Sequence, residues 1–180
     1  SHRFIDKEKA LQGLHTKNAY ELKNKLYQKA TTIIHGQENL PADLLNSSVV
    51  VVGNSMSKSF ADNFKVPTFW ISSSPTQDEI DLLLKNLASY STVIFAVFDI
   101  NKRDYVTFGI SPLLINLIDQ LLNKTTIVTL FGTPYSAKLF KNANTLIVAY
   151  ECEDEAQEAA ASIIKGNCKA SGLLPISIDL

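Results

Sequence analysis

The chain has 180 residues, of which 46% are hydrophobic and 19% charged, and its formal net charge is −1. These values are typical of one soluble globular domain with a sizeable core, and they exclude the strongly basic surface that attracts nucleic acids or anionic membranes. No apolar run approaches the roughly 20 residues that a membrane-spanning helix needs, so we expect neither nucleic acid nor membrane as a partner.

The first 46 residues form a segment of their own in the sequence pattern. Residues 1–16 are mixed and polar, and they lack the pattern of a secretory signal. A helix is predicted over 16–30 because apolar side chains recur on one stripe, formed by Ala19, Leu22, Leu26 and Ala30. A short β-branched strand over 31–34 follows. We interpret residues 1–46 as a helical arm or linker and residues 47–180 as a regular domain.

The domain over 47–180 alternates between apolar strands and amphipathic helices. The strands are apolar throughout, as in a mainly parallel sheet covered on both faces. They are predicted over 48–52, 68–71, 92–98, 125–130 and 145–149. We therefore predict an α/β fold: an open, mostly parallel sheet of five or six strands with helices on both faces. This is a flavodoxin-like three-layer sandwich, preceded by an N-terminal helical arm.

Several helix boundaries are marked by capping residues. Thr76 and Glu79 form a T-x-x-E capping box, and Ser111-Pro112 combines a serine cap with a proline in the first turn. The last helix is predicted to begin with acidic side chains and to stop at Gly166, as the helix dipole and a glycine stop favour.

Three short motifs follow one another in the last third of the chain. They are Gly132-Thr133-Pro134-Tyr135, Ala149-Tyr150-Glu151 and Ala170-Ser171-Gly172-Leu173-Leu174-Pro175-Ile176-Ser177. Together with the arm, this order resembles the C-terminal α/β sandwich domain of family 3 glycoside hydrolases. Thr133 and Leu173 depart from the asparagine and lysine that are usual there. The structural signature residues are Gly132, Pro134, Tyr135, Tyr150, Glu151, Gly172 and Pro175.

The resemblance implies a catalytic domain and a separate, non-catalytic domain in one polypeptide. Members of that family carry an aspartate nucleophile on an N-terminal (β/α)8 barrel, and no segment of this chain matches the barrel. We therefore expect a non-catalytic C-terminal domain that packs on the catalytic barrel of the same polypeptide and shapes the active-site rim, with carbohydrate at the domain interface. The chain alone is expected to be inactive and to hold no catalytic residue, metal or cofactor. The arm over 1–46 would lead in from the barrel.

The stretch Glu151-Cys152-Glu153-Asp154-Glu155-Ala156-Gln157-Glu158 indicates the branch of the family. β-Glucosidases often carry Pro-Gly-x-Glu-Gly-Gly before the last helix, and this chain does not. Its pattern is most similar to bacterial β-N-acetylglucosaminidases, and a β-glucosidase is the alternative. A bacterial origin and a periplasmic or extracellular location, rather than a cytoplasmic one, are the corresponding expectations.

A long polar loop after the strand over 92–98 supplies the candidate substrate-rim residues, Asp99, Asn101 and Arg103. The loop follows the carboxyl end of a strand, where open α/β sheets bind ligands. We predict that these residues face the barrel or the sugar. The alternative is a solvated loop without a function of its own.

Other reactive residues favour structural explanations. The acidic residues over 151–155 complement a helix dipole, although retaining glycosidases also need paired carboxylates. Cys152 has acidic neighbours, which raise a thiol pKa, so we predict an inert cysteine. Cys152 and Cys168 lie at opposite ends of one predicted helix, too far apart for a disulfide. Trp70 and Tyr135 are assigned to core or interdomain packing rather than to sugar stacking.

A free-standing flavodoxin-like ligand-binding or receiver domain is the alternative function. Such a domain would bind its ligand at the carboxyl ends of the strands, around Gly53, residues 72–74 and Asp99. This alternative depends on the doubly wound pattern alone.

Overall fold

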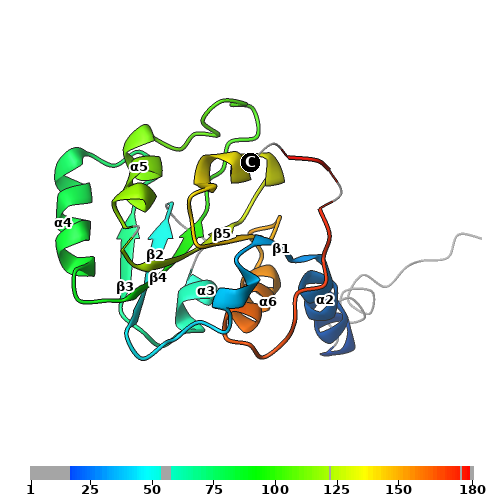
Figure 1. Ribbon diagram of the computed structural model, residues 1–180. Coiled ribbons are helices and arrows are strands. Elements are labelled where there is room, and N and C mark those ends of the chain that lie inside the picture. The colour runs from blue at the N-terminus through cyan, green and yellow to red at the C-terminus, as the bar shows by residue number, and fades with distance from the viewer. Residues whose placement is uncertain (1–16, 54–57, 122, 175, 179–180) are drawn as a thin grey trace, which may run out of the picture.

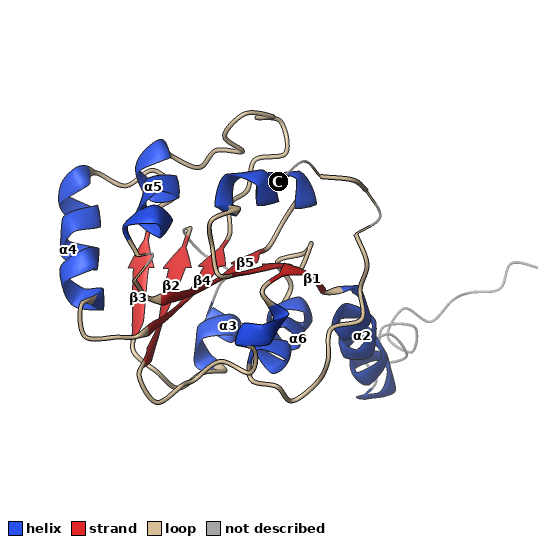
Figure 2. Cartoon of the chain, viewed as in Figure 1, coloured by secondary structure: helices blue, strands red, loops and turns tan. Residues whose placement is uncertain are grey.

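Figures 1 and 2 show the computed structural model, which describes residues 17–53, 58–121, 123–174 and 176–178. Over these residues the chain forms a six-stranded sheet in the order β1-β6-β5-β4-β2-β3. Strands β2 to β6 are parallel, and β1 pairs antiparallel with β6. The strands are β1 (Thr32–His35), β2 (Ser47–Val52), β3 (Thr68–Ile71), β4 (Thr92–Val97), β5 (Thr125–Leu130) and β6 (Thr145–Val148). The sheet is mostly parallel, as predicted, and its parallel strands have the flavodoxin-like order 2-1-3-4-5.

Helices cover both faces of the sheet (Figure 2). On one face lie α4 (Gln77–Leu87), α5 (Pro112–Gln120) and the 3-10 helix η2 (Pro134–Phe140); on the other lie α3 (Lys58–Asp62) and α6 (Asp154–Ile164). The sheet has a hydrophobic core on each face. Val50 and Val52 of β2 pack in the core beneath α4, α5 and η2, whereas Val49 and Val51 pack in the core beneath α3 and α6. This alternation confirms the predicted three-layer sandwich. None of the described helices is both long and apolar enough to cross a bilayer.

The helix starts predicted from capping residues are present. The Glu79 N–H donates to the Thr76 hydroxyl at 3.3 Å, and the Thr76 N–H donates to the Glu79 carboxylate at 2.7 Å, which completes the capping box of α4. At α5 the Leu114 N–H donates to the Ser111 hydroxyl at 3.4 Å, and Pro112 is the first helical residue. Local capping chemistry therefore sets where these helices begin.

Helix α2 (Lys17–Ala30) lies beside α6, next to β1 (Figure 1). Its orientation differs from the one that its apolar stripe favours. Leu22 and Leu26 of the stripe are 59% and 58% exposed, and the polar face of the helix contacts α6. The side of α6 that meets α2 carries carboxylates, which need polar partners, and this explains why the leucines are left outside.

The arm is joined to the sheet. Thr32 of β1 pairs with Val148, and the 3-10 helix η1 (Gln37–Asn39) follows β1. The Ala42 N–H then donates to the Ile164 carbonyl at 2.9 Å, beside the end of α6. Residues 17–46 therefore pack along one edge of the domain body.

Candidate functional site at the carboxyl edge of the sheet

The parallel strands end at one edge of the sheet, which we call the carboxyl edge. The strand order reverses between β2 and β4, and open α/β sheets bind ligands at such a switch point. Gly53 follows β2, and Asp99 lies just beyond β4. A Cβ added at Gly53 would lie 2.9 Å from Asp99 Oδ2, so the two residues pack directly together. Residues 54–57, which follow Gly53, lie outside the described residues.

Residues 99–110, which we call the rim loop, fold around the carboxylate of Asp104. Its Oδ1 accepts hydrogen bonds from the N–H groups of Val106 (3.0 Å) and Thr107 (3.1 Å). Its Oδ2 accepts from the Thr107 hydroxyl and, at 3.1 Å, from the Gly109 N–H. The Thr107 hydroxyl and then the backbone N–H groups hold the pKa of Asp104 well below its usual range. The rim loop is thus internally hydrogen-bonded, and Phe108 anchors it in the interior at 2% exposure.

The three predicted rim residues lie along this loop. Asp99 is exposed at the base of the loop and has a φ of 57°, an uncommon value for a residue with a side chain. The Arg103 N–H donates to the Asn101 side-chain oxygen at 3.0 Å, and the Asn101 N–H donates to the Phe108 carbonyl at 2.8 Å. All three residues are exposed at the carboxyl edge, and Asn101 also helps to hold the loop.

Sequence reasoning missed the two most exposed apolar residues of the rim loop. Tyr105 and Val106 are 77% and 73% exposed. Lys138 of η2 donates to the Tyr105 carbonyl at 3.0 Å, and its ammonium lies 5.1 Å from the centre of the Phe108 ring. The available signal was Asp104 followed by Thr107 and Gly109, because aspartate side chains bind nearby backbone N–H groups in turns and push the intervening residues outward.

Cys152 is a free thiol just before α6. Its Sγ donates to the Phe131 carbonyl at 3.4 Å, and the residue is half-buried. Burial, followed by the negative charges of Glu151 and Asp99, raises the pKa of the thiol. This direction agrees with the prediction of an inert cysteine, since the thiolate is the nucleophilic form. Cys168 is also a free thiol, as expected from the predicted separation of the two cysteines.

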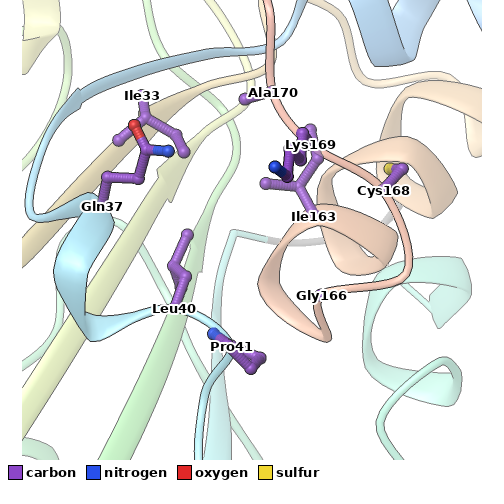
Figure 3. A pocket seen from close by; sticks show the side chains of 9 residues that line it. All are labelled: Ile33, Gln37, Leu40, Pro41, Ile163, Gly166, Cys168, Lys169 and Ala170. Carbon is purple, nitrogen blue, oxygen red and sulfur yellow. The ribbon is translucent and has the colours of Figure 1, made fainter.

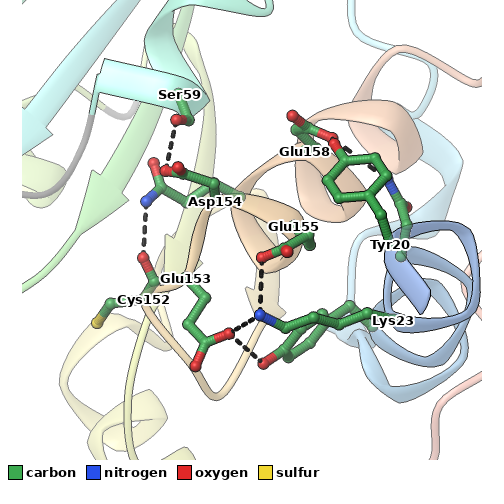
Figure 4. Close-up of polar contacts among 11 residues, drawn as sticks. Tyr20, Lys23, Ser59, Cys152, Glu153, Asp154, Glu155 and Glu158 are labelled. Carbon is green, nitrogen blue, oxygen red and sulfur yellow. Dashed lines mark hydrogen bonds and ion pairs between the residues drawn. The ribbon is translucent and has the colours of Figure 1, made fainter. Parts of the chain in front are cut away.

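The acidic residues of α6 are engaged with α2 (Figure 4). The Lys23 ammonium pairs with Glu153 and, at 3.0 Å, with Glu155. The Tyr20 hydroxyl donates to Glu158 at 2.5 Å. The hydrogen bond from Lys23 lowers the pKa of Glu153, and the same contact raises the pKa of Lys23. These carboxylates therefore hold a helix in place as well as complementing a helix dipole.

A buried glutamine joins α6 to α3. Gln157 is fully buried; its Oε1 accepts from the Phe60 N–H at 2.9 Å, and its Nε2 donates to the Cys152 carbonyl at 2.7 Å. Nearby, the Ser59 hydroxyl donates to Asp154 at 2.6 Å. The side chains that follow the Ala-Tyr-Glu motif thus connect elements of the fold.

Two glycines of the resemblance allow close packing. A Cβ at Gly132 would lie 2.9 Å from the Ile100 side chain, so this glycine lets the rim loop pack on the turn after β5. A Cβ at Gly172 would lie 2.3 Å from the Ala30 carbonyl oxygen, which places the closing segment against the end of α2. Both positions therefore require the absence of a side chain.

The other signature residues are partly explained. Tyr150 has a φ of 66°, and its hydroxyl lies 3.0 Å from the Thr32 hydroxyl of β1. Pro134 is the first residue of η2, and Tyr135 beside it is 53% exposed. Glu151 is exposed. The remaining signature residue, Pro175, lies outside the described residues.

A small cavity lies away from the rim loop, between the segment after β1 and the segment after α6 (Figure 3). Its volume is about 190 Å³, below the roughly 300 Å³ at which ligand pockets usually begin. Its lining is Ile33, Gln37, Leu40, Pro41, Ile163, Gly166, Cys168, Lys169 and Ala170. Among the described residues, no group of three or more histidine, cysteine or acidic side chains is placed to hold a metal ion.

Comparison with known proteins gives matches in structure only. No family model matches the chain, and no curated protein matches its sequence. A family 3 β-N-acetylglucosaminidase from Paenibacillus sp. FPU-7 matches with a TM-score of 0.73 and 20% identity, over 90% of this chain and 33% of the enzyme. A fungal multi-domain family 3 β-N-acetylglucosaminidase matches with a TM-score of 0.70 and 18% identity, over 93% of this chain and 20% of the enzyme. A β-glucosidase from Listeria innocua matches with a TM-score of 0.69 and 12% identity, over 92% of this chain and 27% of the enzyme.

These matches concern the fold. The chain spans a third or less of the length of the three enzymes and has the fold of one part of each. The similarity that the three sequence motifs indicated is therefore confirmed at the level of the fold.

Proposed function

We propose that the chain is the non-catalytic C-terminal domain of a family 3 glycoside hydrolase of the β-N-acetylglucosaminidase type. In this role it packs on a (β/α)8 catalytic barrel of the same polypeptide. The observation that carries the proposal is the fold similarity over 90% of this chain but only 33% of the Paenibacillus enzyme. The remaining two thirds of such an enzyme leave room for a catalytic domain. The ordered motifs from Gly132 to Ser177 support the same assignment.

Two observations support the β-N-acetylglucosaminidase type over a β-glucosidase. The Paenibacillus enzyme is 20% identical to this chain, against 12% for the Listeria β-glucosidase. In addition, the sequence before the last helix does not contain the Pro-Gly-x-Glu-Gly-Gly motif that β-glucosidases often carry there.

The rim loop is the part of the chain proposed to shape the active site. It lies at the carboxyl edge, and the bonds to Asp104 hold it in one conformation. It exposes Arg103 and Tyr105, a cation and an amphipathic ring of the kind suited to sugar hydroxyls and sugar faces. Carbohydrate would therefore bind between this loop and the barrel.

The test compares this 180-residue chain with the polypeptide that carries the proposed barrel upstream of Ser1. Both are assayed on an aryl β-N-acetylglucosaminide and an aryl β-glucoside. We expect the chain alone to be inactive and the longer polypeptide to cleave the N-acetylglucosaminide. Turnover by the chain alone would overturn the non-catalytic role, and a preference of the longer polypeptide for the glucoside would overturn the subtype.

A flavodoxin-like ligand-binding domain is the second candidate function. The observation in its favour is the 2-1-3-4-5 strand order, with Asp99 against Gly53 at the switch point. Thermal unfolding of the chain with flavin mononucleotide or a nucleoside triphosphate distinguishes the two functions. A saturable rise in melting temperature favours this candidate, and no change favours the hydrolase domain.

A further inference from the structure

Helix α2 turns its polar face toward α6 and leaves its apolar stripe exposed to solvent. Lys23 and Tyr27 contact Glu153 of α6, while Leu22 and Leu26 are 59% and 58% exposed. A surface helix ordinarily does the reverse and places its apolar stripe on the core. Neighbouring exposed leucines on an inverted helix indicate that another surface covers them.

The exposed face of α2 has a defined chemistry. Residues at spacings of three and four share one side of a helix, so Leu22, Lys25, Leu26 and Lys29 form one face, with Ala19 one turn earlier. All five residues are exposed. We call them the outer face of α2. Neither Lys25 nor Lys29 makes an ion pair with a described residue. The matching surface is therefore apolar, with carboxylates along one side.

We propose that the outer face of α2 docks on the catalytic domain that would precede it in the polypeptide. This inference depends on the proposed function, because that function places a folded domain upstream of Ser1. A domain attached there is tethered within a short segment, residues 1–16, of α2. Such a tether raises the effective concentration of the two surfaces, so even a small patch is occupied.

The position of α2 suits this docking. Thr32, two residues after the helix, pairs with Val148 at the end of β6, so α2 ends at the carboxyl edge of the sheet. Asp99 and the rim loop lie along the same edge. A domain seated at this edge would therefore meet the C-terminal end of α2 and the rim loop together.

The small size of the outer face argues against a second copy of the chain as the partner. The helix has 14 residues, of which the outer face includes two leucines and one alanine. Stable interfaces between separate proteins bury about 800 Å² on each side, much more than such a patch supplies. A covalently attached domain does not need that area, because it does not lose its free translation on docking.

The polar contacts with α6 hold the outer face in position. Lys23 bridges Glu153 and Glu155, and both Tyr20 and Asn24 donate to Glu158. Because these bonds fix α2 on the domain, a contact on the outer face would also fix the angle between the two domains. Leu22 and Leu26 would thus contact the catalytic domain from a helix that α6 already fixes in position.

Thiol labelling of Leu26→Cys tests the proposal. The variant is made in a background of Cys152→Ser and Cys168→Ser, both in this chain and in the longer polypeptide with the upstream domain. Leu82→Cys on α4 is the matched control, because Leu82 is 59% exposed and lies on the opposite edge of the sheet, beside β3. A covered thiol reacts only when the interface opens, so we expect labelling of Leu26→Cys to be about tenfold slower or more in the longer polypeptide. The control is expected to react at the same rate in both.

The outcomes separate this inference from the proposed function. A longer polypeptide that cleaves the N-acetylglucosaminide while Leu26→Cys labels at its unhindered rate overturns the docking and leaves the function standing. A longer polypeptide that cleaves neither glycoside overturns the function. Slow labelling of Leu26→Cys already in the 180-residue chain would overturn the docking, because it would show that residues 1–16 cover the outer face. If that slow rate depends on protein concentration, a second copy of the chain covers it instead. Equal slowing of Leu82→Cys would also overturn the assignment to α2.

Discussion

Gly172 passes so close to Ala30 that a Cβ at position 172 would lie 2.3 Å from the Ala30 carbonyl oxygen. The Thr32 hydroxyl and the Thr31 carbonyl oxygen would lie 2.6 and 2.7 Å from the same point. The segment after α6 is therefore laid across the junction between α2 and β1, and only a residue without a side chain fits there.

Substitution Gly172→Ala tests this contact. The added methyl group meets backbone oxygen atoms, which cannot move as a flexible side chain would, so the backbone itself must shift. We expect the free energy of unfolding in urea to fall by about 1–3 kcal/mol, the usual cost of overpacking. Leu173→Ala, at a position that is 88% exposed, is the control and should change it by no more than about 0.5 kcal/mol. A Gly172→Ala protein of unchanged stability would show that the closing segment is not tightly placed.

Gln157→Leu tests the buried bridge between α6 and α3. Leucine has a similar size but leaves the Phe60 N–H and the Cys152 carbonyl without the partners that Gln157 supplies. Because an unsatisfied buried polar group costs about 1–3 kcal/mol, we expect at least that loss in the free energy of unfolding. The same substitution at the exposed Gln120 of α5 is the control and should be close to neutral. Equal effects at both positions would contradict a structural role for the bridge.

Asp104→Asn tests the rim loop and its pH dependence. The hydrogen bonds depress the folded-state pKa of Asp104, so its contribution is present above the ordinary aspartate pKa of about 3.9 and is lost as the pH falls through the folded-state pKa. We expect the amides of Val106, Thr107 and Gly109 to exchange with solvent faster in the variant at neutral pH. In the wild type their protection should decline only in strong acid.

Asp81→Asn is the control for that experiment, because Asp81 is an exposed carboxylate on α4, away from the rim loop. It should leave the three amide exchange rates unchanged. Protection that persists in Asp104→Asn would show that packing of Phe108, rather than the carboxylate, holds the loop.

Lys23→Gln tests the attachment of α2 to α6. Lys23 lies between Glu153 and Glu155 with its side chain 42% exposed, so salt should screen much of the interaction. We expect the variant to be less stable than the wild type at 50 mM salt, with a difference that shrinks at about 1 M salt, where the screening length falls to roughly 3 Å. Lys25→Gln on the outer face of α2 should show no such salt-dependent difference. A salt-independent loss for Lys23→Gln would contradict an electrostatic attachment.

Tyr105→Ala tests the proposed rim function in the longer polypeptide with the barrel. If the ring packs on a sugar beyond the scissile bond, its loss removes binding that the ground and transition states share. We expect KM for oligosaccharides to rise about two- to tenfold with kcat unchanged. Leu45→Ala, at a fully exposed position, should leave both constants unchanged. An unchanged KM for Tyr105→Ala would show that Tyr105 does not contribute to binding of the sugar.

The local features of the chain could be predicted from the sequence. The expected strands over 68–71 and 125–130 have those bounds in the structure, and the capping box of Thr76 and Glu79 forms as expected. These features depend on neighbours within a few residues, such as a hydroxyl that binds the N–H three positions later. The mostly parallel three-layer sandwich was also predicted, because apolar strands that alternate with amphipathic helices favour a parallel sheet covered on both faces.

The candidate site could be predicted only in part. The position of Asp99 after a strand indicated the carboxyl edge, but its packing against Gly53 joins residues that are far apart in the sequence. The rim loop was expected to be polar, yet Asp104 rather than Asp99 is the carboxylate that organises it.

The sequence by itself determined the strands, the helix starts and the parallel sheet, because periodicity and capping act over short distances. Only the tertiary structure decided which face of α2 is covered, why position 172 is glycine, and where the acids of α6 are directed. Helical periodicity showed an apolar stripe on α2 but not its partner, since burial depends on what lies opposite. Opposite α2 lie carboxylates of α6, so Tyr20 and Lys23 turn inward and the leucines remain outside.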